Sequence, residues 1–189
     1  VHTTFSDGRN PLAECVKAAE AMGLKCVAIT DHFWGRGDED IYERVRQIAR
    51  FDAASEITVV PGVEGYVRNP DGEVSVGEDE AKLVRWVLVD ITWATEGIGR
   101  NAPLSKKKLI SNIEAAMVNV AANPLVDAIA HPFNFGRFDV PVYLTDLPVA
   151  SLERIAEAMA VNDCAFEIMN KAYWWYPDLS VEAIVDQFV

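Results

Sequence analysis

The sequence predicts an α/β fold built around a parallel, barrel-like sheet. Short apolar runs rich in β-branched residues alternate with amphipathic stretches along the 189 residues, and no internal repeats or low-complexity tracts interrupt them. Repeated strand-then-helix units in one chain are typical of parallel sheets with helices on the outside. Because half of the residues are apolar, the chain can bury one sizeable core, and we expect a single domain over residues 1–189.

The apolar runs predict strands at residues 25–30, 57–63, 85–92, 125–130 and 165–169. The amphipathic stretches predict helices at residues 11–22, 38–54, 105–121, 146–161 and 180–188. Gly23 is a usual helix stop, and the second helix opens with acidic residues that suit the positive end of its dipole. Ser105 is a candidate N-cap. Residues 69–72 predict a turn, followed by a polar surface segment that reaches Glu80.

Three of the predicted strands lead directly into residues that commonly bind metals, namely His32, Glu64 and His131. Asp31, beside His32, is placed to orient the imidazole or to hold a metal itself. The C-terminal ends of parallel strands meet at one rim, where α/β enzymes keep their chemistry, so these side chains are expected to converge. The remaining histidine, His2, precedes a Ser-Asp-Gly sequence. A lone histidine is more often structural, but the shared position at strand ends favours a metal site.

Five motifs follow one another in a fixed order: His2-Thr3-x-x-Ser6-Asp7-Gly8, Thr30-Asp31-His32, Pro61-Gly62-Val63-Glu64, Ala130-His131-Pro132 and Glu167-Ile168-Met169-Asn170. In order and spacing they resemble the PHP (polymerase and histidinol phosphatase) superfamily over essentially the whole chain. The resemblance implies a distorted (β/α)7, TIM-like barrel with parallel strands and outer helices. It also implies a centre of two or three divalent metal ions that hydrolyses phosphoesters.

Carried over residue by residue, the resemblance implies that His2, Asp7, His32 and His131 are metal ligands. Glu64 is the expected bridge between two metals, and Glu64 and Asp31 are the expected catalytic carboxylates. Asp7 also has a simpler interpretation, because Asp-Gly is a common turn pair. The mixed histidine and carboxylate ligands suit zinc, manganese and iron, so the sequence does not identify the metal.

The sequence departs from the family pattern in three places. The first histidine of the opening His-x-His pair would lie immediately before Val1, and the closing Asp-x-His would lie beyond Val189, so a barrel truncated at both ends is expected. Thr92 stands where a ligand histidine normally ends a strand. Because a threonine hydroxyl is a weak ligand for zinc or manganese, one metal is expected to be lost, weakened, or completed by water or Asp90.

Candidate substrate-binding residues follow the predicted ligands and strands. Arg36 and Arg137 are either phosphate-binding groups or ordinary surface charges, and a bidentate contact with phosphate would suit arginine. Asn170 and Lys171 end a predicted strand and are candidates for contact with substrate. The expected partner is a small phosphorylated molecule.

The composition limits the partners and the compartment. A formal charge of −12 and a pI near 4.6 argue against general nucleic-acid binding, because no basic stripe is available to neutralise a phosphate backbone. The three cysteines form no C-x-x-C pair, so we interpret them as reduced core or helix residues of a cytoplasmic protein. The sequence has no apolar stretch long enough for a membrane helix. The oligomeric state is not predicted.

The main functional hypothesis is a metal-dependent phosphoesterase that acts on a phosphomonoester or a small nucleotide-like phosphate. A bound cation lowers the pKa of water, so a metal-activated water is expected to attack phosphorus. One alternative is an amidohydrolase-like metal hydrolase that cleaves a carbon–nitrogen bond. The other is a catalytically weakened, metal-binding regulatory domain, which is suggested by Thr92 in the place of a ligand histidine.

Overall fold

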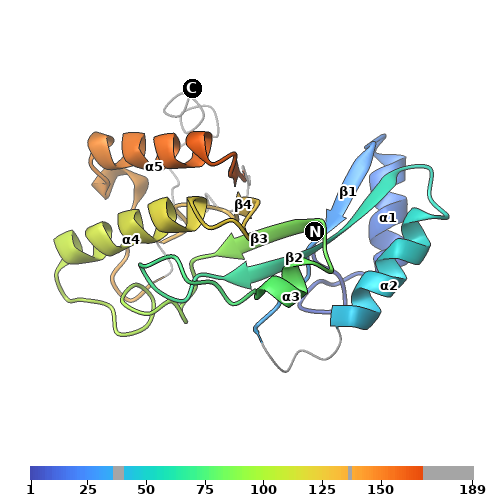
Figure 1. Cartoon of the computed structure of the whole chain (residues 1–189), viewed down its shortest axis with the longest axis horizontal. Helices are drawn as coiled ribbons and strands as arrows, with labels where there is room; N and C mark the ends of the chain where they lie inside the picture. Colours follow the sequence, from blue (N-terminus) through green and yellow to red (C-terminus); the bar gives the residue numbers. More distant parts are fainter. Residues whose placement is uncertain (36–40, 136–137, 168–189) are drawn as a thin grey trace. The chain divides into compact units, whose positions relative to one another are not determined.

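The computed structural model (Figure 1) describes residues 1–35, 41–135 and 138–167. The chain divides into two compact units. The first unit comprises Val1–Tyr66 and Ser75–Val89, and the second comprises Val67–Val74 and Asp90–Val189. Each unit contains both strands and helices, so the predicted α/β class is confirmed. That residues 1–189 form a single domain stays a prediction.

The first unit is built from α1 (Leu12–Ala21), β1 (Cys26–Ile29), α2 (Ile41–Asp52), β2 (Thr58–Tyr66), α3 (Glu78–Ala81) and β3 (Trp86–Asp90). The last residue of β3, Asp90, belongs to the second unit. The strands lie in the order β1-β2-β3. β1 and β2 are parallel, with Cys26 opposite Thr58 and Ile29 opposite Pro61. The expected parallel arrangement is therefore confirmed for this pair.

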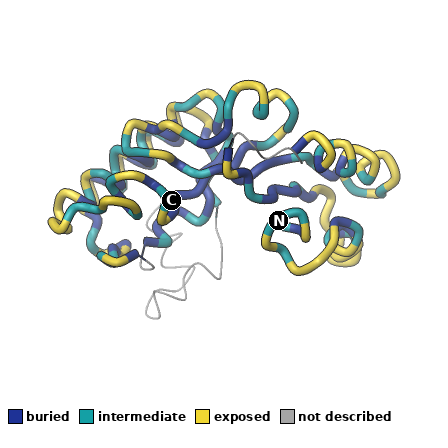
Figure 2. The backbone as a smooth tube through the Cα atoms, turned by 90° about the horizontal axis from the view of Figure 1, so that it is seen from below, coloured by how far each residue is buried: buried dark blue, intermediate teal, exposed yellow. Residues whose placement is uncertain are grey.

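One apolar core joins α1 and α2 to the same face of β1 and β2 (Figure 1). The strands contribute alternate residues, Val27 and Ile29 from β1 and Val59 from β2, because successive side chains of a strand point to opposite faces. The helices contribute residues spaced three or four apart, including Leu12 and Val16 of α1. Along the helices, one side is buried and the other exposed (Figure 2).

The three strands of the first unit approach closely at Gly62 of β2. A Cβ atom at this position would lie 2.8 Å from the carbonyl oxygen of Trp86 and 2.9 Å from the Cγ2 atom of Thr30. Both distances are too short for a carbon atom, so only glycine allows β2 to lie between its two neighbours at this point.

The second unit is built from α4 (Lys106–Ala121), β4 (Ala128–Ile129), the 3-10 helix η1 (Leu144–Asp146), α5 (Val149–Val161) and β5 (Ala165–Phe166). β4 and β5 are parallel, with Ala128 opposite Ala165. Ser105 is the N-cap of α4, as predicted, and its hydroxyl accepts a hydrogen bond from the main chain of Lys108. α4 and α5 pack against each other, and Arg154 of α5 donates to Glu114 of α4 over 2.6 Å.

Several predicted boundaries differ from the structure. β2 continues two residues beyond Glu64, which lies within the strand and not at its end. The helix predicted from residue 146 begins at Val149, because Pro148 has an extended conformation and η1 precedes it. The segment before Glu80 is not wholly a surface loop, since Val76 is buried and Val67 pairs with Val74. Cys26 is exposed and not part of a core.

Two further predictions about the fold are not tested by the described residues. The described ranges contain five strands, and a seven-stranded barrel stays a prediction. The predicted helix at residues 180–188 lies outside the described residues, as does the end of the strand predicted at 165–169. Within the described residues, no helix combines the length and apolar character needed to cross a lipid bilayer.

We predict that Ile113→Ala lowers the free energy of unfolding by about 2 to 5 kcal/mol, the range for removing a buried isoleucine side chain. Ile113 lies on α4 and has no exposed surface. Chemical denaturation monitored by circular dichroism measures the change. Lys107→Ala, on the exposed side of the same helix, is the control and should change stability little. Equal stability of the two variants would contradict the packing described for α4.

Candidate metal centre

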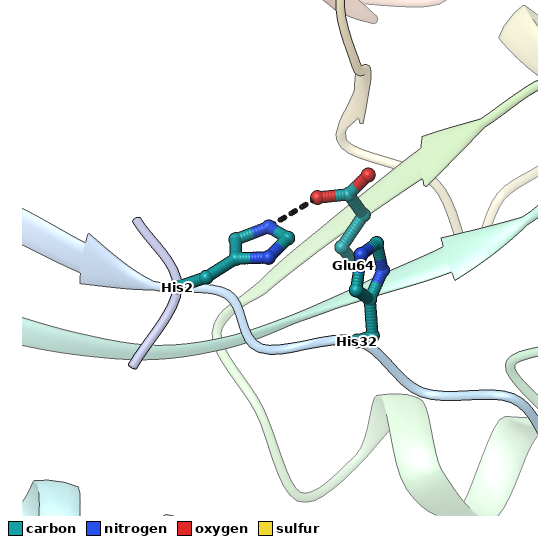
Figure 3. A group of neighbouring side chains, drawn as sticks. All are labelled: His2, His32 and Glu64. Atoms are coloured by element: carbon teal, nitrogen blue, oxygen red, sulfur yellow. Dashed lines mark hydrogen bonds and ion pairs between the residues drawn. The ribbon is translucent and has the colours of Figure 1, made fainter. Parts of the chain in front are cut away.

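Parallel pairing of the main chain brings His32 and Glu64 together. The pairing of β1 with β2 continues beyond β1 as a parallel bridge between these two residues. The Glu64 N–H donates to the Asp31 carbonyl over 3.1 Å, and the Phe33 N–H donates to the Glu64 carbonyl over 2.8 Å. Paired positions in neighbouring strands carry their side chains on the same face, and the two side chains stand together on one side of the strands (Figure 3).

His2 reaches the same place because the opening segment runs beside β1. The Thr30 N–H donates to the Val1 carbonyl over 2.8 Å, which places the next residue level with the end of the strand. His2 Nε2 then lies 2.5 Å from Glu64 Oε2 (Figure 3). The rings of His2 and His32 meet edge to face, with centroids 4.5 Å apart.

His2, His32 and Glu64 form a donor set that fits a divalent cation. One potential ligand atom from each lies within 4.8 Å of the other two. Two imidazole nitrogens and a carboxylate oxygen are ligands that zinc, manganese and iron accept. The Glu64 side chain is only 4% exposed, and a buried carboxylate requires a compensating positive charge. A cation or a protonated His2 can supply that charge at the same position.

Asp7 holds His2 from the opposite side of the ring. Its Oδ1 lies 2.7 Å from His2 Nδ1, and its Oδ2 lies 3.5 Å from His32 Nε2. Gly8 makes this turn possible, because a Cβ there would lie 2.4 Å from the carbonyl carbon of His2. The Gly8 N–H also donates to the Thr3 carbonyl over 3.0 Å. The Ser-Asp-Gly sequence thus forms a turn and places a carboxylate at the centre.

The two carboxylates change the acidity of His2. Burial is the largest single influence and lowers the pKa of His2. The hydrogen bonds to Glu64 and Asp7, together with the negative charges of these two carboxylates, outweigh burial and raise the pKa from 6.5 to about 9. In turn, the hydrogen bond from His2 lowers the pKa of Asp7. In the metal-free protein, His2 is therefore the positive group between two negative ones.

Asp31 binds the opening segment of the chain. Its carboxylate is nearly fully buried and accepts hydrogen bonds from the Thr3 N–H at 2.7 Å, the Thr3 hydroxyl at 2.9 Å and the Ser6 hydroxyl at 2.7 Å. We expected this carboxylate to orient His32 or to hold a metal. These three hydrogen bonds link it to the segment that carries His2 and Asp7, and whether it also orients His32, holds a metal or acts in catalysis stays a prediction.

Two neighbours of His32 were missed in the sequence analysis. Arg44 of α2 is buried and donates to the His32 carbonyl over 2.9 Å. The signal for Arg44 is its spacing from Ile41 and Ile48, which puts a charged residue on the apolar side of a helix. Trp34 stacks on the His32 ring with centroids 4.9 Å apart. In the sequence, only the position of Trp34 two residues after His32 indicates that it lies near the centre.

His131 belongs to a polar group in the second unit. Its main chain has a φ of +26°, a region that residues with side chains rarely adopt and that is associated with functional sites. The His131 N–H donates to Glu167 over 2.6 Å, and its Nδ1 lies 3.5 Å from Asp90 Oδ1. His131, Asp90 and Asn134 line one small pocket within this unit. Whether His131 binds metal stays a prediction.

The other candidate residues are not tested by the structure. Arg36, Arg137, Asn170 and Lys171 lie outside the described residues, and their contacts with substrate stay predictions. Thr92 is buried, and its hydroxyl accepts a hydrogen bond from the Ala94 N–H over 3.0 Å. This hydroxyl therefore stabilises a turn.

Comparison with known proteins identifies relatives. Residues 1–131 match the PHP domain family. A probable phosphatase of Shewanella piezotolerans is 27% identical over 165 residues, which cover 86% of this chain and 58% of the relative. A probable phosphatase of Shewanella frigidimarina is 27% identical over 158 residues, which cover 82% of this chain and 55% of the relative. A probable phosphatase of Acetivibrio thermocellus is 26% identical over 176 residues, which cover 91% of this chain and 65% of the relative. The chain thus spans between 55% and 65% of the length of these relatives.

We predict that His2 of the metal-free protein titrates near pH 9 and that Asp7→Asn lowers this pKa, because a neutral amide no longer attracts the imidazolium. A raised pKa means that protonated His2 contributes to stability below its ordinary pKa of 6.5, and this contribution is lost as the pH rises through about 9. NMR titration of the three histidines measures the pKa values. Asp79→Asn, on the surface of α3, should leave His2 unchanged, and an unshifted His2 in Asp7→Asn would contradict the assigned contact.

Proposed function

This chain belongs to the PHP domain family, and on that premise we propose that it is a metal-dependent phosphatase acting on a small phosphorylated substrate. The observation that carries the proposal is the convergence of His2, His32 and Glu64, whose ligand atoms lie within 4.8 Å of one another. The relatives named as probable phosphatases support the same class of reaction. We propose a phosphomonoester or a small nucleotide-like phosphate as the substrate.

In this proposal, His2 and His32 would hold a divalent ion through imidazole nitrogens, and the buried Glu64 carboxylate would hold it through oxygen. A bound zinc, manganese or iron ion lowers the pKa of water and neutralises charge on phosphate oxygens. Because its carboxylate has two oxygens, Glu64 would also be able to hold a second ion. In the second unit, we propose His131 and Asp90 as donors to a further ion.

The remaining residues of the first unit would hold the ligands in place. We propose that Asp7 orients His2, because its contact with Nδ1 leaves Nε2 directed at Glu64. We propose that Asp31 acts as a positioning residue through the segment it binds. Arg36, Arg137, Asn170 and Lys171 remain our candidates for contacts with the substrate.

We predict that protein produced with zinc and manganese supplied contains metal and hydrolyses p-nitrophenyl phosphate, and that a chelator abolishes this turnover until metal is restored. Glu64→Gln should lose both metal and activity, because it removes a buried charged ligand. Glu43→Gln, on the exposed surface of α2, is the matched control and should retain both. Elemental analysis gives the metal content, and a colorimetric assay gives the rate.

The outcomes of this experiment separate the candidate functions. Protein without metal under these conditions would overturn the proposal. Bound metal without phosphatase turnover would support the weakened regulatory domain, and turnover of an amide substrate alone would support the carbon–nitrogen hydrolase.

The role of Asp7 is tested by two substitutions. Asp7→Ala should weaken metal binding by about 10- to 100-fold, the usual cost of removing a group that orients a ligand histidine. Asp7→Asn should cost less, because the amide oxygen still accepts a hydrogen bond from His2. Titration with zinc against a competing chelator measures the affinity. An equal loss in both variants would instead identify Asp7 as a direct ligand.

A further inference from the structure

A row of aromatic rings extends from the candidate metal centre toward the surface. His2 meets His32 at 4.5 Å, His32 meets Trp34 at 4.9 Å, and Trp34 meets Tyr66 at 5.9 Å, all between ring centroids. The His32 and Trp34 rings are stacked, with 29° between their planes, and the Trp34 and Tyr66 rings are tilted by 42°. The row belongs entirely to the first unit.

Trp34 is exposed although it lies beside this centre. Its relative exposure is 52%, whereas the preceding residue, Phe33, is 2% exposed and already anchors the segment in the core. A tryptophan needed only for packing would bury its ring, because the indole has a large apolar surface. The ring therefore presents apolar surface to solvent one ring away from a predicted phosphate-binding centre.

We propose that Trp34, with Tyr66 beside it, stacks against an aromatic ring in the organic group that is esterified to the phosphate. This inference rests on the proposed phosphatase function and names its substrate class as aryl or nucleoside-type phosphates. With the phosphate at His2, His32 and Glu64, the esterified group extends along the row of rings toward Trp34. Stacking of a ring on an aromatic side chain does not depend on the identity of the ring, because every aromatic ring has a π-face.

The charge of the chain favours a small ligand over a polymer. A net charge of −12 repels the repeated phosphates of a nucleic acid, whereas a single phosphate group requires only local compensation. The substrate that satisfies both conditions is a small molecule with one aromatic ring system and a phosphate ester.

Two esters that differ only in the ring test the inference on the metal-loaded protein. Trp34→Ala should lower kcat/KM for phenyl phosphate by about five- to a hundred-fold more than for propyl phosphate, the fold-change that corresponds to loss of one stacking contact. For each ester, the kcat/KM of the variant is divided by that of the parent, which cancels the difference in intrinsic reactivity between the two esters. Trp34→Phe, which keeps a ring, should retain most of the preference, and Trp34→Leu, which keeps apolar bulk, should lose it.

Tyr42→Ala is the matched control, because Tyr42 is 54% exposed and lies in the same unit on α2. It should change neither rate. Calorimetric binding of phenylphosphonate and propylphosphonate gives a second readout without hydrolysis, and Trp34→Ala should weaken the phenyl compound selectively. Metal content is measured for every variant.

Each outcome decides between the two proposals. If the parent protein hydrolyses neither ester and binds neither phosphonate, the phosphatase function itself fails. If it hydrolyses both esters and Trp34→Ala keeps the parent's preference for the phenyl compound, the stacking inference alone fails. An equal loss for both esters together with loss of metal would show that Trp34 only supports His32, which also overturns the inference.

Discussion

The candidate centre depends on the register between β1 and β2. The pairing that sets Cys26 opposite Thr58 continues until His32 stands opposite Glu64. Because side chains alternate between the two faces of a strand, a shift of one residue would move Glu64 to the other face and separate it from His32. The apolar core on α1 and α2 fixes this register, and the close approach at Gly62 allows it. Packing far from the centre therefore determines whether its ligands meet.

Two buried carboxylates in the first unit are stabilised in different ways. Asp31 accepts hydrogen bonds from neutral donors on Thr3 and Ser6, which are fixed parts of the chain. Glu64 faces a histidine whose charge depends on protonation. A cation can take the place of the proton on His2, whereas the donors on Asp31 belong to the chain itself. This difference favours the proposed positioning role for Asp31 and the proposed ligand role for Glu64.

The sequence predicted the local features of the fold well, since apolar periodicity alone located β1, β2 and α4 to within a few residues. It also predicted that His32 and Glu64 would meet, because the ends of neighbouring parallel strands share one rim. It could not predict that β2 continues beyond Glu64, since strand length depends on pairing partners distant in sequence.

The contact partners of individual side chains also could not be predicted from the sequence. The contacts of Asp31 with Thr3 and of Arg44 with the His32 carbonyl join segments whose relative placement no local pattern specifies. Trp34 was overlooked for a similar reason, since an aromatic residue after a strand is compatible with packing. Only its exposure beside His32 distinguishes it.

Electrostatics sets an order of events at the centre. Asp7 and Glu64 place two carboxylates around His2, and the chain as a whole is strongly acidic. An anionic phosphate approaching the metal-free centre would meet two carboxylates, whose charge exceeds that of the His2 imidazolium between them. A divalent ion bound first would cancel the net negative charge of this group, because its charge exceeds by one that of the proton it displaces. Under the proposed function, metal binding therefore has to precede phosphate binding. The aromatic row then adds selectivity without adding charge, because stacking on Trp34 discriminates between organic groups and leaves the electrostatic attraction of the phosphate to the metal.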